Sequence, residues 1–129
     1  MLFTTKTEYG LKALGFLAKT KDKKPVSLGE ISRQTGISLS YLEQIFSKLK
    51  VAGLVLSLKG SDGGYVLARP ANKIKILEII ESLEGELAVF YCMAQGGCCS
   101  SRGCGTKKVW VDLQNNIAKT LNKYKLSDL

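Results

Sequence analysis

The sequence predicts a mainly α-helical protein that carries one small β-hairpin. Apolar residues recur at helical spacing in several segments, two short capped helices are joined by a glycine-containing turn, and a glycine-rich turn separates two short apolar strands. The chain has 129 residues, which suits one domain with a modest core. Its apolar content of 45% and charged content of 23% are typical of a folded globular protein.

The first helix is predicted over residues 5–20, where the apolar side chains recur every three or four positions. The segment KTKDKKP that follows ends this helix with charge and Pro25. The apolar residues that define its buried face are Tyr9, Ala13, Leu14, Phe16 and Leu17.

A helix-turn-helix motif is predicted next. Ser27 and Glu30 have the spacing of a capping box, which predicts a short helix over 27–34. Thr35-Gly36-Ile37 is a tight turn, and either Ser38 or Ser40 caps the second helix. The apolar stripe of that second helix consists of Leu39, Leu42, Ile45 and Leu49.

A β-hairpin follows this motif directly. Residues 55–58 and 65–68 are predicted strands, and the turn KGSDGG between them contains residues that tolerate positive backbone angles. A helix-turn-helix followed by a hairpin is the element order of a winged helix-turn-helix domain, which predicts DNA binding. The net charge of +8 agrees, because residues 1–70 carry eleven basic and five acidic side chains.

Two more helices are predicted, over 71–84 and over 107–125. The second has an apolar stripe that includes Trp110 and Leu113, which either folds back on its own domain or forms the seam of a dimer. We therefore expect three parts: a winged helix-turn-helix DNA-binding domain (1–84), a cysteine-containing loop that binds a cluster (85–104) and a dimerisation helix (105–129). A homodimer would match a pseudo-palindromic site on double-stranded DNA.

The second helix of the motif is expected to enter the major groove, with its N-terminal residues nearest the bases. Gln44 can bond to adenine, Glu43 can accept from cytosine, and a lysine at the hairpin tip can reach the DNA backbone. Capping, packing and solubility are alternative roles for the serines, the tyrosine and the hairpin lysine. The candidate DNA-binding residues are Ser38, Ser40, Tyr41, Glu43, Gln44, Lys48 and Lys59.

All four cysteines of the chain lie in one short glycine- and serine-rich segment, YCMAQGGCCSSRGC, and the chain has no histidine. Structural zinc sites usually use C-x2–4-C pairs, which are absent here. An iron–sulfur cluster accepts thiolates from a looser loop, whereas a thiol switch needs only two of the four. From the chemistry alone, a cluster, a thiol switch, zinc and incidental cysteines all stay open. The four are Cys92, Cys98, Cys99 and Cys104.

The run ISLSYLEQIFSKLKVAGLVLSLKGSDGGYVLARP, the cysteine spacing and the W-x2-L helix resemble the Rrf2 family of winged-helix regulators, which includes IscR-, NsrR- and CymR-type members. The resemblance implies a homodimeric DNA-binding transcription regulator, and we expect a repressor. Cluster-bearing members hold an iron–sulfur cluster with cysteines at the positions of Cys92, Cys98 and Cys104. The resemblance also implies that the regulator controls cluster-biogenesis genes or genes of the redox and nitric oxide responses. The alternative is a cluster-free repressor of the thiol-switch or cysteine-metabolism type.

The fourth ligand departs from the IscR pattern. The position that is histidine in IscR-like members is Lys107 here, and a charged ammonium is a poor ligand. The resemblance offers Glu8 of the partner subunit, and Cys99 is the alternative. Three cysteines and one further ligand fit either a 2Fe–2S or a 4Fe–4S cluster; we favour 2Fe–2S and expect that a purified sample can lose it.

An enzyme is not expected. The chain has no histidine, no C-x-x-C motif and no paired carboxylates in a plausible pocket. No apolar run approaches the ~20 residues that span a bilayer, and the first residues lack the apolar core of a signal peptide. We therefore expect a cytoplasmic protein without a membrane partner, in a compartment where thiols stay reduced.

Overall fold

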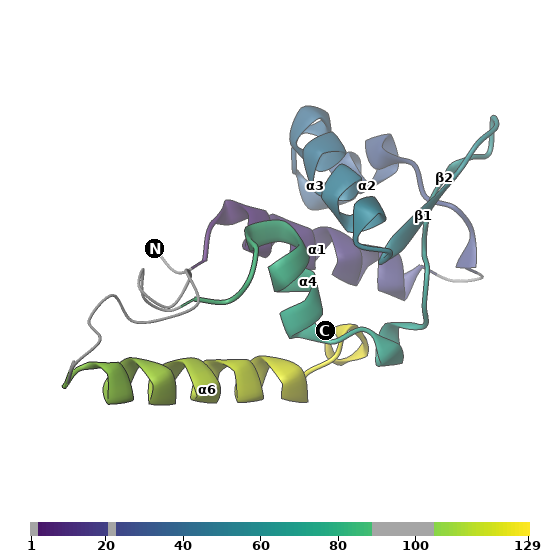
Figure 1. The fold of residues 1–129 in the computed structure, drawn as a ribbon. Helices are drawn as coiled ribbons and strands as arrows, with labels where there is room; N and C mark the ends of the chain where they lie inside the picture. Colours follow the sequence, from purple (N-terminus) through teal and green to yellow (C-terminus); the bar gives the residue numbers. More distant parts are fainter. Residues whose placement is uncertain (1–2, 21–22, 89–104) are drawn as a thin grey trace.

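The computed structural model describes residues 3–20, 23–88 and 105–129 and contains the predicted helices and hairpin (Figure 1). None of the helices in these three ranges is long and apolar enough to cross a membrane. The prediction of a mainly α-helical protein with one hairpin is confirmed. In chain order the elements are α1 (Thr5–Lys19), α2 (Leu28–Thr35), α3 (Leu39–Val51), β1 (Val55–Leu58), β2 (Gly64–Leu67), the 3-10 turn η2 (Ala71–Lys73), α4 (Ile76–Glu84), α6 (Lys107–Lys123) and the 3-10 turn η3 (Leu126–Asp128).

Side-chain caps fix the starts of the two helices in the helix-turn-helix motif. The Ser27 hydroxyl accepts a hydrogen bond from the backbone N–H of Glu30 at 3.1 Å, as predicted. The reciprocal half of the capping box is not formed, because the Glu30 carboxylate binds Arg33 and Gln34 instead. Ser38, rather than Ser40, is the cap of α3 and accepts from the N–H of Tyr41 at 3.3 Å.

Gly36 ends α2 in the left-handed conformation, with φ 75°, which lets the chain turn sharply into α3. The buried face of α3 then consists of Leu42, Ile45, Phe46 and Leu49. Leu39 was predicted to belong to the same apolar stripe as Leu42. It lies about a turn before Leu42 and is 47% exposed, so it is not part of the buried face.

The hairpin pairs β1 with β2 in antiparallel register, with Val55 opposite Leu67. Tyr65 also forms an isolated antiparallel bridge to Val26, through hydrogen bonds of 3.0 and 2.8 Å, so the residue before the α2 cap is paired with the hairpin. A side chain at position 64 would not fit, because a Cβ there would lie 2.4 Å from the carbonyl carbon of Val26. The hairpin, which is the wing of the winged helix-turn-helix fold, is therefore attached directly to the start of the helix-turn-helix motif.

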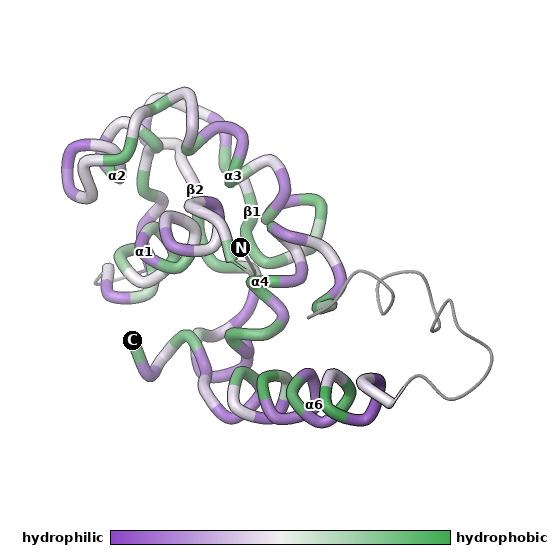
Figure 2. Tube along the Cα trace, turned by 90° about the vertical axis from the view of Figure 1, so that its left-hand side faces the viewer, coloured by the Kyte–Doolittle hydropathy of each residue, from purple (hydrophilic) through white to green (hydrophobic). Residues whose placement is uncertain are grey.

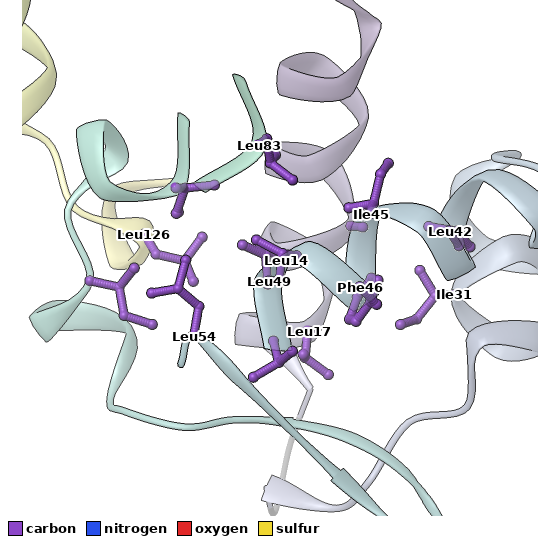
Figure 3. Packing of buried hydrophobic residues seen from close by; sticks show 14 of the residues in the cluster. Leu14, Leu17, Ile31, Leu42, Ile45, Phe46, Leu49, Leu54, Leu83 and Leu126 are labelled. Atoms are coloured by element: carbon purple, nitrogen blue, oxygen red, sulfur yellow. The ribbon is translucent and has the colours of Figure 1, made fainter. Parts of the chain in front are cut away.

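A single hydrophobic cluster joins α1, α2, α3, β1, α4 and the C-terminal turn (Figure 3). Phe46 of this cluster is fully buried, and its ring centroid lies 4.9 Å from that of Tyr65. Burying aliphatic side chains in this way stabilises the fold by roughly 1.5–3 kcal/mol for each large residue. The same cluster thus holds α3, which is the expected recognition helix, the hairpin and the C-terminal end of the chain in one arrangement.

The helix predicted over 71–84 begins later, at Ile76. Residues 74–76 are instead paired with residues 124–126: the N–H of Leu126 donates to the Ile74 carbonyl at 2.9 Å, and the N–H of Ile76 donates to the Tyr124 carbonyl at 3.0 Å. These long-range bonds hold Ile74 and Lys75 extended, which overrides their helical pattern. Leu126 is 1% exposed and belongs to the central core.

Helix α6 lies alongside the winged-helix body, at the side away from α3 (Figure 1; Figure 2). It ends at Lys123, two residues before the predicted end, where the chain turns back into the core. Leu121 packs against the core cluster, whereas Val109 is 60% and Leu113 is 41% exposed. The apolar stripe of α6 therefore packs on its own domain at Leu121, and it is exposed to solvent at Val109 and Leu113.

Candidate nucleic-acid interface and cluster segment

The exposed face of α3 is a polar stripe. With about 100° per residue, Ser40, Glu43, Gln44 and Ser47 fall within an arc of about 100° on the helix surface. All four are exposed. The stripe contains hydroxyl, amide and carboxylate groups but no cation; these groups can bond to base edges, and the hydroxyls and the amide can also bond to phosphates.

Tyr41 faces α1 rather than this stripe. Its phenolic oxygen lies 3.1 Å from Oγ1 of Thr5, and its ring meets that of Tyr9 edge to face, with centroids 5.5 Å apart. The ring is half-buried. Tyr41 therefore links the recognition helix to the first turns of α1, the packing role that was the alternative to DNA contact.

Lys48 lies on the same flank as Tyr41 and reaches towards α4. Its Nζ donates to the carbonyl oxygen of Leu83 at 3.3 Å. The predicted DNA-binding residues therefore occupy two faces of α3: Ser40, Glu43 and Gln44 point outward, while Tyr41 and Lys48 contact neighbouring helices.

The tip of the hairpin carries Lys59, which is exposed and directly follows β1. Gly60, with φ 119°, begins the turn there. Arg33 of α2 is also exposed but pairs with the Glu30 carboxylate. Lys59 has no ion pair among the described residues, so it remains a candidate for the phosphate contact that is expected at the hairpin tip.

The first turn of α1 is held by Glu84, the last residue of α4. The Glu84 carboxylate accepts from the Thr4 backbone N–H at 3.1 Å, from the Thr4 hydroxyl and from the Thr7 hydroxyl at 2.9 Å. Partial burial raises the pKa of Glu84, but these hydrogen bonds favour the charged form and hold the pKa below its ordinary value. Sequence reasoning missed this network, because a threonine-rich helix start signals only a local cap.

Glu8 lies in the same turn of α1, and its side chain is exposed. Its carboxylate makes no hydrogen bond or ion pair with any residue in the described ranges, so it is available to an external ligand. Residues 3–20, 23–88 and 105–129 contain no group of acidic or cysteine side chains that could hold a metal ion by themselves. The predicted ligands Cys92, Cys98 and Cys104, together with Cys99, lie outside the described residues.

Comparison with known proteins assigns the family. The family model of Rrf2, described as an iron-dependent transcriptional regulator, matches residues 3–129. The transcriptional regulator IscR of Cronobacter sakazakii is 38% identical over 129 residues, which is all of this chain and 80% of the relative.

Two solved structures of regulators are also similar to this chain. CymR, the global cysteine regulator of B. subtilis, has a TM-score of 0.83 and 31% identity, over 99% of this chain and 95% of its own. IscR of T. potens has a TM-score of 0.79 and 37% identity, over 99% of this chain and 85% of its own. These relatives are transcription regulators and not enzymes. The chain therefore belongs to the Rrf2 family of DNA-binding transcription regulators.

Proposed function

We propose that this regulator binds its promoters as a homodimer and that an iron–sulfur cluster, held by Cys92, Cys98 and Cys104, controls the binding. The fourth ligand is the partner subunit's Glu8, and Cys99 is the alternative. The observation that carries the proposal is the position of the first turn of α1, which contacts both the end of α4, just before the cysteine segment, and the recognition helix.

The available donors fit such a cluster. Thiolates are its usual ligands, and a carboxylate can complete a set of three. Lys107 would be a charged ammonium, and the chain has no histidine. The carboxylate of Glu8, which is exposed and has no partner among the described residues, is therefore a suitable fourth donor. When bound, the cluster supplies a group that responds to oxidation, nitric oxide or loss of iron.

The chain's own residues would transmit this state to DNA. Glu84 ties the start of α1 to the end of α4 through Thr4 and Thr7. Thr5 and Tyr9 tie the same part of α1 to Tyr41 in α3. A ligand that binds Glu8 would thus act on the first turn of α1, which is hydrogen-bonded to the recognition helix. Ligand binding and DNA binding would then be coupled reciprocally.

The exposed part of α6 supports the dimer. Val109 and Leu113 present apolar surface one helical turn apart, with no cover from the described part of their own chain. A second copy of α6 would bury it. Two recognition helices in a twofold dimer would then match half-sites of a pseudo-palindromic operator, about one helical turn of DNA apart.

The test is anaerobic reconstitution with iron and sulfide, followed by visible absorption and by fluorescence anisotropy with operator DNA. We expect Cys92→Ala, Cys98→Ala and Cys104→Ala to abolish the absorption, and Glu8→Ala to change or weaken it. Cys99→Ala should retain it, and Glu81→Ala, an exposed acid on α4, is the matched control for Glu8→Ala. Reconstituted protein that stays colourless, or that binds operator equally with and without iron, would overturn the proposal.

A thiol switch is the second candidate function. The chain is 32% identical to S. aureus CymR, with a TM-score of 0.77 to a structure described as the oxidised form, and two of the four cysteines would suffice for a disulfide. In this case mild peroxide treatment of the iron-free protein would change operator affinity, and Cys→Ser replacement would remove the effect. Reconstitution with iron and sulfide would leave that affinity unchanged.

A further inference from the structure

The strand pairing between the wing and the segment before α2 stops after one bridge. Val26 and Tyr65 exchange two backbone hydrogen bonds, of 3.0 and 2.8 Å. In an antiparallel ladder the next pair of this kind would be Lys24 with Leu67, two residues further along each strand. No backbone hydrogen bond joins these two residues in the described part of the chain, where the bridge at Val26 is isolated. The backbone N–H and C=O groups of Lys24 and Leu67 therefore lack a strand partner on this edge.

The conformation of Lys23 explains why the pairing stops. Its φ is 49°, and within the described ranges it is the one residue other than glycine with a positive φ. A strand needs a strongly negative φ, so the ladder cannot continue through Lys23. A residue with a side chain adopts this left-handed conformation at a cost in free energy, and such residues are concentrated at functional sites. The separation of this segment from the wing is therefore a feature of the backbone itself.

A cavity of about 520 Å³ lies where the two segments separate, and residues of both segments line it. This volume is within the range of small-molecule sites, about 300–1,000 Å³. Lys23 and Lys24 contribute the polar part of one wall. The last turn of α1, strand β2 and the chain that follows β2 contribute apolar side chains, which include Leu17, Ala18, Val66, Leu67, Ala68 and Ala71. The cavity thus combines an apolar lining with unpaired backbone groups.

The charge of the lining is positive. Among the described residues that line the cavity, Lys23, Lys24 and Arg69 are cationic and none is acidic. The Arg69 guanidinium is already held by the Glu78 carboxylate and by the Lys73 carbonyl oxygen, the latter at 3.3 Å. Lys23 and Lys24 take part in neither of the ion pairs found in the described ranges. A ligand with a negative group would therefore be attracted by these two ammonium groups.

We infer that this cavity binds a small organic carboxylate with an apolar body. The apolar body would contact the alanine and leucine side chains, and the carboxylate would lie near the two lysines. A backbone N–H of Lys24 or Leu67 can donate to one of the carboxylate oxygens, which strengthens the contact. The ligand would thus replace the missing step of the ladder and connect residues 23–24 to the wing. The inference is independent of the cysteine segment and does not need a cluster.

The probe is 4-phenylbutyrate, titrated into isotope-labelled protein at low salt, where exposed charges are weakly screened. The amide chemical shifts of Lys24, Leu67 and Ala68 should change together and saturate, with a dissociation constant on the order of 1 mM for a ligand of this size. The neutral analogue 4-phenylbutyramide has the same apolar body. It should bind about two- to fivefold more weakly, which is the range for one exposed ion pair.

Two variants test the lining separately. Lys24→Gln removes one charge and should weaken binding of 4-phenylbutyrate by about two- to fivefold, while binding of the amide stays unchanged. Ala18→Leu should abolish the binding of both ligands, because the larger side chain would occupy part of the cavity. Leucine favours a helix, so this variant should remain folded. Lys19→Gln is the matched control for Lys24→Gln, because Lys19 is an exposed residue of α1 outside the lining.

Chemical-shift changes confined to other parts of the chain, or no changes at about 10 mM 4-phenylbutyrate, would overturn the inference. Equal affinities for the acid and the amide would also overturn it. So would equal losses of binding in Lys19→Gln and Lys24→Gln, because attraction to the overall positive charge would then explain them. Losses confined to Lys24→Gln and Ala18→Leu, with cooperative thermal unfolding of both variants, would support it. These results do not depend on iron or on the cysteines, so they are separate from the tests of the cluster.

Discussion

The phenolic oxygen of Tyr41 lies 3.1 Å from Oγ1 of Thr5, so the recognition helix is hydrogen-bonded to the first turn of α1. That turn also binds Glu84 and carries Glu8. A residue expected to read DNA thus connects the DNA-binding face to the turn that would receive the cluster. Substitutions along this connection, and in the parts of the fold that hold it, should have distinct effects.

Tyr41→Phe and Thr5→Val each remove one side of this hydrogen bond. We expect each to lower the free energy of unfolding by no more than about 1 kcal/mol, because the bond is exposed and water can replace it. The double variant should cost little more than either single one, because both remove the same interaction. Urea unfolding of the two single variants and the double variant measures these changes in the free energy of unfolding.

Operator affinity separates the two roles of Tyr41. If Tyr41 acts through Thr5, both single variants change the affinity by the same factor. A loss of affinity in Tyr41→Phe alone would instead show that the hydroxyl contacts DNA. Additive losses of stability would contradict the coupling.

Glu84 should make stability depend on pH. Its folded pKa is below the ordinary value of 4.5, so its charged form stabilises the fold above that pH and the contribution is lost as pH falls through the folded pKa. Glu84→Gln should lower the free energy of unfolding at pH 7 by about 1 kcal/mol. It should also flatten the dependence of that free energy on pH below about 5.

Denaturant unfolding at a series of pH values measures this effect. Glu81→Gln on the exposed side of α4 is the control and should leave both the stability and its pH dependence nearly unchanged. An unchanged pH dependence in Glu84→Gln would exclude the carboxylate as the source.

Gly64→Ala should loosen the wing. The added Cβ would lie 2.4 Å from the carbonyl carbon of Val26, and backbone cannot move aside cheaply. A loss of about 1–3 kcal/mol is expected, as for other overpacked positions. Gly29→Ala is the control, since its Cβ would meet only the Ser27 hydroxyl at 3.8 Å and alanine favours helix α2. Thermal unfolding that ranks the two variants equally would refute this account of the wing.

Gln44→Ala and Lys59→Ala should differ in the kind of affinity that they lose. Gln44 is exposed on the polar stripe of α3, so its loss should cost about 1–3 kcal/mol on the operator and little on random DNA. Lys59 at the wing tip should contact phosphate, so its loss should weaken binding to all sequences and reduce the salt slope by about 1. Titrations at several salt concentrations distinguish these outcomes, and identical behaviour of both variants would contradict the assignment.

Local sequence determined most of the secondary structure. Ser27 and Gly36 mark the ends of α2 as predicted, because a cap and a left-handed turn depend on adjacent residues only. The glycine-rich turn likewise determined the hairpin. The four cysteines, with no histidine in the chain, already limited the ligand chemistry before any fold was known.

Tertiary packing decided what depends on distant partners. Ile74 and Lys75 are extended because their segment bonds to residues 124–126, although its own pattern is helical. Tyr41 and Lys48 turn towards α1 and α4 because Thr5 and the Leu83 carbonyl lie there. Periodicity assigns a residue to a helix, but it does not identify the distant groups that pack against each face. The pairing of Glu84 with α1 and the bridge between Lys75 and Lys125 arise from the same cause, contacts between segments far apart in the chain.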